Sequence, residues 1–167
     1  MSGPSTRHLV AVWAAITICG TVDVFTQNAP GCQRVEGLLE ETLVPPPTCT
    51  SPVGLCTIAR MFGDLKGQAR FSATAFIPSA DTPTTTVIFV TGDTVVADAK
   101  LANNRGTLLV KNAAAYRTTG NGDLVDNQTI VGGTGDFAGA SGSLRISGHF
   151  LAETGGVSRF EGIVCVP

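Results

Sequence analysis

Short runs of alternating apolar and polar residues recur along the chain from about residue 33 onward, separated by Gly, Pro, Asn or Asp. Valine, isoleucine, threonine and phenylalanine recur in these runs, and such residues favour the pleated backbone of a β-strand. No segment combines the spacing and the caps of an amphipathic helix. We expect short helical turns only in 95–102 and around Phe137 in 133–141. The pattern predicts eight strands, at 33–44, 56–65, 67–78, 84–98, 106–117, 124–132, 142–152 and 157–166.

Eight antiparallel strands in a chain of 167 residues predict an all-β fold, either an up-and-down barrel or a sandwich. Closure into a barrel removes the exposed sheet edges that invite aggregation. The interior of an eight-stranded barrel holds side chains or one small ligand. We therefore expect residues 33–166 to form a single β-barrel domain, because the length leaves no room for a second.

The N-terminus has the pattern of an export signal. Arg7 and His8 precede the ten apolar residues 9–18, a run that is too short to span a bilayer. We expect residues 1–25 to be a signal peptide with an undefined cleavage point and 26–32 to be a leader. The mature protein is then secreted or extracytoplasmic, with no membrane span. The alternative is that this run forms a buried strand or helix.

The cysteines that remain after such processing are even in number, which favours disulfide bonds in an oxidising compartment. They are Cys32, Cys49, Cys56 and Cys165, and three pairings are open. No C-x-x-C pair occurs and His149 is the one histidine left, so a metal site has little support. In a closed antiparallel barrel the first strand meets the last. We therefore expect a Cys32–Cys165 bond across that seam and a Cys49–Cys56 bond in the proline-rich loop.

The chain carries few charges. Only 14% of the residues are charged while 43% are hydrophobic, a composition that excludes a disordered chain. The net charge of −2 offers no footprint for nucleic acid. We expect no nucleic-acid partner and no cofactor. A wall with so few charges exposes apolar surface, and we expect a symmetric homodimer or homotrimer to cover it.

The glycine-rich stretch 128–142 (QTIVGGTGDFAGASG) is the most distinctive part of the sequence. Within it, 133–138 satisfies the G-x-G-x-x-A pattern of dinucleotide sites, but that pattern requires a helix to follow. Further glycines and a strand-like alternation follow instead, which argues against a nucleotide site. We interpret the stretch as a corner whose glycines permit positive φ angles and whose Phe137 plugs one end of the barrel.

This corner resembles the corresponding segment of plant dirigent proteins and of allene oxide cyclase-like barrels, including their bacterial relatives. Residues 90–95 (VTGDTV) and 62–67 (FGDLKG) are weaker points of resemblance. The resemblance implies an eight-stranded antiparallel barrel of calycin type with an apolar pocket at one mouth. It also implies an activity on a small reactive molecule, because the family includes isomerases that cyclise a reactive epoxide and dirigent proteins that steer radical coupling.

Strand alternation gives the candidates for chemistry inside the barrel. It directs Glu41, Asp93 and Tyr116 inward near the mouths, and Arg60 can pair with such a carboxylate. A carboxyl group in an apolar pocket has a raised pKa, which suits it to protonate or orient a substrate oxygen. The alternative for Asp93 is a rim residue bound to a loop, and for Tyr116 a core residue with a solvated hydroxyl. His149 is expected outside, which disfavours a Ser-His-Asp triad.

Three functions fit this sequence. The first is a secreted barrel that binds a small apolar or reactive molecule and cyclises or steers it, as an isomerase or cyclase. The second is a carrier of an apolar ligand without catalysis. The third is a structural barrel filled by its own side chains. A cavity near 300 Å³ with converging polar groups would favour the first two.

Overall fold

The computed structural model describes residues 31–78 and 87–167, and residues 1–30 and 79–86 are not described further. The expected signal peptide and most of the expected leader therefore lie outside the described residues. All regular structure in the described ranges is β-strand. The strands are β1 (Cys32–Leu43), β2 (Cys56–Gly63), β3 (Leu65–Pro78), β4 (Val87–Leu101), β5 (Asn104–Arg117), β6 (Asp123–Gly135), β7 (Ser141–Leu151) and β8 (Gly155–Cys165). No helix in these ranges is long and apolar enough to cross a membrane.

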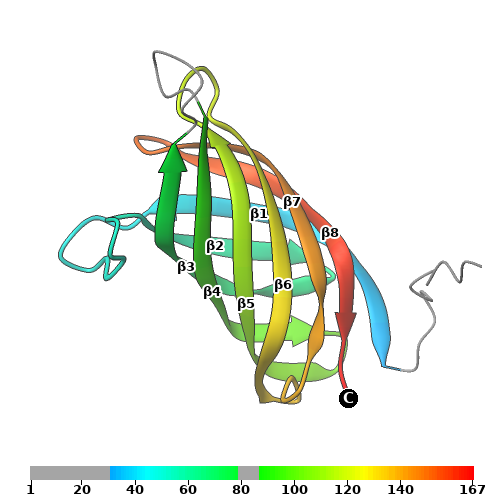
Figure 1. Ribbon diagram of the computed structural model, residues 1–167. Coiled ribbons are helices and arrows are strands. Elements are labelled where there is room, and N and C mark those ends of the chain that lie inside the picture. The colour runs from blue at the N-terminus through cyan, green and yellow to red at the C-terminus, as the bar shows by residue number, and fades with distance from the viewer. Residues whose placement is uncertain (1–30, 79–86) are drawn as a thin grey trace, which may run out of the picture.

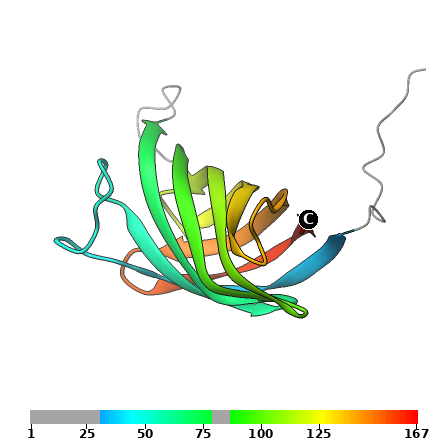
Figure 2. The same cartoon turned by 90° about the horizontal axis from the view of Figure 1, so that it is seen from below.

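The eight strands form a closed antiparallel barrel in which each strand pairs with its neighbours in sequence, as predicted (Figure 1). The barrel closes where β1 pairs with β8. Seen from below, these two strands, blue and red, lie side by side (Figure 2). Cys32 and Cys165 are opposite each other in this pairing and form a disulfide bond. A second disulfide joins Cys49 to Cys56. Both expected pairings are confirmed.

The expected helical turn at 95–102 is wrong, because these residues continue β4 as far as Leu101. A β-bulge interrupts the pairing of β4 with β5 between Val96 and Ala99. Asp98 lies within this bulge and has a φ of 50°. Such an irregularity accommodates extra residues in one strand while the ladder resumes beyond it. The interruption of the apolar–polar alternation within 95–102 therefore reflects a bulge in β4, not a helix.

The connection between β6 and β7 is a tight turn around Phe137, not the expected turn of helix, because β6 continues as far as Gly135; the Phe137 side chain is fully buried. The backbone N–H of Phe137 donates to the carbonyl of Thr134, and Ala140 N–H donates to the carbonyl of Phe137. A Cβ atom at Gly133 would lie 2.1 Å from the carbonyl oxygen of Thr107, so only glycine fits this approach. The glycine-rich corner thus positions one aromatic ring in the core.

The two ends of the barrel differ in how they are filled. One end carries the β2–β3, β4–β5 and β6–β7 turns, and we call it the packed end. Large, fully buried side chains pack together there, namely Leu65, Leu101, Leu108, Phe137, Phe160 and Val164. The opposite end, which we call the mouth, carries the connections 44–55, 118–122 and 152–154. The site described next lies in the mouth half.

Candidate functional site

A cavity of about 240 Å³ occupies the mouth half of the barrel. This volume is somewhat below the range of about 300–1,000 Å³ typical of ligand pockets. It exceeds the roughly 150 Å³ of an engineered cavity that admits benzene. The interior is therefore not packed solid along its whole length. Most of the lining is apolar, contributed by Leu39, Leu55, Ala59, Ala69, Phe71, Phe76, Ile88, Val90, Ala114, Leu124, Ile146, Phe150 and Ala152.

A chain of polar side chains crosses the wall of this cavity from β4 to β6. Thr94 Oγ1 donates a hydrogen bond of 2.9 Å to Asn112 Oδ1. Asn112 Nδ2 then donates to Asp126 Oδ2 at 2.7 Å. Gln128 Nε2 donates to the same oxygen at 2.9 Å. The four residues are buried and line the cavity. The bonds from Asn112 and Gln128 hold the Asp126 carboxyl group in one orientation.

Asp126 is the most unusual member of this chain. Its side chain is 7% exposed, and its Oδ1 atom is buried without a hydrogen-bond partner among the described residues. Burial raises the pKa of Asp126, and the hydrogen bonds from Gln128 and Asn112, together with the nearby backbone of Ala113, oppose that rise. Buried polar atoms in folded proteins are nearly always paired, so the unpaired Oδ1 atom distinguishes Asp126 from the other polar side chains of the cavity wall.

Glu41 lies in the same cavity, as its position on the inner face of β1 predicts. Its Oε1 atom accepts a hydrogen bond from Thr57 Oγ1 of β2. Burial raises the pKa of Glu41, the bond from Thr57 lowers it, and the negative charge of Asp126 raises it further. The two carboxyl groups are therefore close enough to affect each other. A shared low-dielectric cavity disfavours ionisation of both at once.

Tyr116 also lines the cavity, near the mouth. Its hydroxyl donates a hydrogen bond of 3.0 Å to the carbonyl oxygen of Phe150, and the two rings meet edge to face with their centroids 6.4 Å apart. Burial and the charge of Glu153 raise the pKa of Tyr116. Its ring belongs to the wall of the cavity, and its hydroxyl connects β5 to β7.

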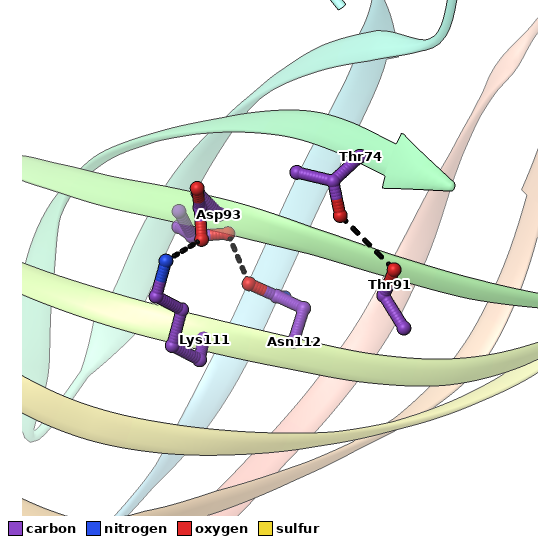
Figure 3. A network of polar contacts seen from close by, with 6 residues as sticks. Thr74, Thr91, Asp93, Lys111 and Asn112 are labelled. Atoms are coloured by element: carbon purple, nitrogen blue, oxygen red, sulfur yellow. Dashed lines mark hydrogen bonds and ion pairs between the residues drawn. The ribbon is translucent and has the colours of Figure 1, made fainter. Parts of the chain in front are cut away.

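The expectation that Asp93 points into the barrel is wrong. Its carboxylate forms an ion pair of 2.5 Å with Lys111 on the outer wall, and both side chains are about half exposed (Figure 3). The adjacent residue Thr94 faces the cavity instead. At the start of β4 both faces carry apolar residues, so alternation alone does not identify the inner one. Thr94 pairs with the buried Val110 of β5, and this pairing places the Thr94 side chain on the inner face.

Arg60 does not meet the inner carboxyl groups either. It is exposed, and its guanidinium carbon lies 5.4 Å from the centre of the Phe62 ring. Its cross-strand partner on β1 is Glu40, whereas Glu41 pairs with the buried Ala59. Glu40 and Arg60 therefore share the outer face. His149 is exposed on β7, as expected.

The sequence reasoning missed Asp126 and its partners Gln128 and Asn112 as polar members of one site. On β6 the usual pattern is inverted, because Asp126 and Gln128 face the interior while Val125 is 39% exposed. Alternation therefore marks this strand but does not say which face is inside. The residues described contain no group of three or more His, Cys, Asp or Glu side chains arranged to hold a metal ion.

Comparisons with family models, with curated proteins and with solved structures each gave no match to this chain. The fold and the cavity therefore define the class: an eight-stranded antiparallel β-barrel, closed by a disulfide, with a partly apolar cavity that holds two carboxyl groups.

Proposed function

We propose that this barrel binds a small, mainly apolar molecule in its mouth-half cavity and assists the isomerisation or cyclisation of that molecule. The observation that carries the proposal is the pair Glu41 and Asp126 in an otherwise largely apolar cavity. Carboxyl groups with pKa values shifted by burial and by each other are typical of acid–base sites. The resemblance to allene oxide cyclase-like and dirigent-type barrels supports the same activity.

In this proposal Glu41 is the acid. Burial and the charge of Asp126 both favour its protonated form, so it can donate a proton to a substrate oxygen. The resulting carboxylate then takes a proton from a substrate carbon, and the molecule is rearranged without gain or loss of atoms. The apolar wall holds the substrate in a reactive conformation, which by itself can supply a large part of the rate acceleration.

A carrier without catalysis is the second candidate. It is favoured by the mainly apolar lining and by the engagement of the Tyr116 hydroxyl with a backbone carbonyl, which removes one polar group from the cavity. Both candidates need an occupied cavity. They differ in whether the bound molecule is changed.

The two disulfides indicate an oxidising, extracytoplasmic environment. A signal peptide at residues 1–25 accounts for the route there, and the apolar run at 9–18 supports it. Protein secreted from its source and N-terminally sequenced should begin after residue 18. A mature protein that retains Met1 would contradict export by cleavage.

Native mass spectrometry of protein purified from its source tests the proposal first, because it detects a co-purifying molecule and counts the subunits. The molecule identified is then supplied to the wild type, to Glu41→Gln and to Glu40→Gln. Glu40 is the matched control, since it is the neighbouring residue on the outer face. We expect Glu41→Gln to bind the molecule without converting it, while Glu40→Gln retains both properties.

Conversion by Glu41→Gln at the wild-type rate would overturn the catalytic role of that residue. Binding without conversion by the wild type itself would favour the carrier. A molecule that binds equally well when Leu39 is replaced by Phe, which fills the cavity, would place the site elsewhere.

A further inference from the structure

The ionisable side chains that the described residues contribute to the cavity are all acids. Of the described residues in its wall, Glu41, Tyr116 and Asp126 can ionise, and none is a lysine, an arginine or a histidine. Glu41 comes from β1, Tyr116 from β5 and Asp126 from β6, while the lining residues of β2, β3, β4 and β7 carry no ionisable side chain. An anionic ligand would therefore meet carboxyl groups and no compensating positive charge from these residues.

The two oxygen atoms of the Asp126 carboxyl group differ in their hydrogen bonds. Its Oδ2 atom accepts two amide hydrogen bonds, from Asn112 and Gln128, which favour the ionised form of the group. No residue in the described part of the chain donates a hydrogen bond to its Oδ1 atom. A carboxylate held in this way has two hydrogen-bond donors at one oxygen atom and needs a donor at the other. A positively charged donor would also offset the cost of burying its charge.

The apolar part of the cavity suits the rest of such a ligand. The rings of Phe71, Phe76, Tyr116 and Phe150 contribute to the wall. Aromatic rings attract ammonium groups through their quadrupoles, and they also bury hydrocarbon. The wall therefore combines an acceptor for a cation with surface for an apolar body.

We propose that the natural ligand is a small apolar amine, bound as its ammonium form with Asp126 as the counter-ion. This inference rests on the proposed function, because it concerns the same cavity. The ammonium nitrogen donates a hydrogen bond to the Asp126 carboxylate, and the hydrocarbon part lies against the aromatic side chains. Glu41 keeps its proton, because the charge on Asp126 favours the neutral form of a nearby carboxyl group.

Binding then has a proton balance that can be measured. At neutral pH the amine arrives as the ammonium ion, and its charge favours the ionised form of Asp126. To the extent that Asp126 is protonated in the free protein, it releases that proton to the buffer on binding, so at most one proton leaves for each amine bound. No proton is released when an uncharged ligand enters. Amine affinity therefore increases as the pH rises through the raised pKa of Asp126.

Calorimetry with the full chain and three matched compounds tests this inference. The compounds are phenylbutylamine, phenylbutanol and phenylbutyrate, which share a hydrocarbon body and differ in the charge at one end. At neutral pH we expect the amine to bind at least about tenfold more tightly than the alcohol, a ratio worth ~1.4 kcal/mol. We expect phenylbutyrate to bind more weakly than the alcohol. Below neutral pH, titrations in buffers of different ionisation enthalpy should show proton release with the amine and none with the alcohol.

Asp126→Asn gives the matched variant, because an amide keeps the shape of the group and can still accept from Asn112 and Gln128. We expect this variant to bind the amine no better than the alcohol. Asp123→Asn is the control, since Asp123 is exposed on the same strand and pairs with Arg117 outside the barrel. It should keep the preference for the amine.

The outcomes separate this inference from the proposed function. If the alcohol binds as tightly as the amine to the wild type, the assignment of an amine is overturned and the ligand-binding cavity stands. If Asp123→Asn loses the preference and Asp126→Asn keeps it, the counter-ion is not Asp126. If none of the three compounds binds, the cavity is not a ligand site for apolar molecules of this size, and the proposed function fails with it. The proton release of the wild type keeps the test valid should Asp126→Asn not fold.

Discussion

Cys32 and Cys165 are direct cross-strand partners at the position where β1 meets β8, and the disulfide between them closes the seam of the barrel covalently. The two residues are 133 positions apart in the sequence, whereas Cys49 and Cys56 are 7 apart. The disulfides therefore constrain the unfolded chain to very different extents.

Removal of the seam disulfide should cost more stability than removal of the loop disulfide. From the lengths of the closed loops, we expect a loss of about 5 kcal/mol for Cys32→Ala with Cys165→Ala, and about 2.5 kcal/mol for Cys49→Ala with Cys56→Ala. Urea unfolding followed by circular dichroism measures both. Equal losses, or a greater loss from the loop pair, would show that chain entropy does not govern the contribution of these bonds.

Leu108 and Leu109 are neighbours on β5 that face opposite sides of the wall, with exposed fractions of 0% and 41%. Leu108→Ala leaves a void among the side chains of the packed end, and we expect it to lower the free energy of unfolding by about 3 kcal/mol. Leu109→Ala removes a partly solvated side chain and should cost below about 1 kcal/mol. Denaturant unfolding of the two variants tests the register of β5, which is incorrect if the order of the losses is reversed.

The raised pKa values of Glu41 and Asp126 make a signed prediction for stability against pH. A carboxyl group whose pKa is higher in the folded state binds more protons when folded, so its stabilising contribution is greatest at low pH. That contribution is lost as the pH rises from the ordinary pKa values of 4.5 and 3.8 through the raised values. Asp126→Asn removes one such group. Its stability relative to the wild type should therefore increase with pH across this window, and a constant difference would contradict the assignment.

Tyr116 is the single tyrosine of the chain, so the absorbance of tyrosinate reports one group. We expect its pKa to lie above the ordinary value of 10.0, because burial and the charge of Glu153 disfavour the phenolate. Glu153→Gln should lower the midpoint toward the ordinary value. A spectrophotometric titration with its midpoint at or below 10.0 would place the Tyr116 hydroxyl in solvent.

The outer wall carries a row of apolar residues near the mouth, in which Ile77 pairs with Phe89, Phe89 with Ala115 and Ala115 with Val125. Ile77 and Phe89 are 57% and 51% exposed. We predict that this row is covered in a symmetric dimer or trimer, because contiguous exposed apolar surface marks interaction sites. Sedimentation velocity should show dissociation in Phe89→Lys and an intact assembly in Thr129→Lys, which changes an exposed residue outside this row. A monomeric wild type at micromolar concentration would refute the prediction.

The architecture and the disulfides were predictable because they depend on periodicity and connectivity. Alternation of apolar and polar residues identifies each strand. An even number of antiparallel strands brings the two ends of the barrel together, whichever face of each strand points inward. The same reasoning placed Glu41 and Tyr116 correctly, because Val35 and Leu39 on β1, and Leu108 and Val110 on β5, define an unambiguous inner face.

The polar part of the cavity was not predictable in this way. On β4 both faces begin with apolar residues, and on β6 the interior side is polar, so neither Asp93 nor Asp126 could be assigned from its own strand. Their orientation follows from pairing with β5, where the buried Asn112 lies opposite Gln128 and the exposed Lys111 lies opposite Asp93. A side chain inside a barrel is therefore identified by its neighbours across the ladder more securely than by its neighbours in sequence.

The closed seam also places Gly31, just before β1, beside Val166, just after β8. Val166 N–H donates a hydrogen bond of 2.8 Å to the carbonyl of Gly31, immediately beyond the disulfide, so the two ends of the domain meet. A short linker between them would let the chain start at Asn104 and finish at Leu101, with all eight ladders retained. The barrel should thus accept circular permutation at the β4–β5 turn. In a closed ring of antiparallel strands, the fold does not depend on which strand comes first in the sequence.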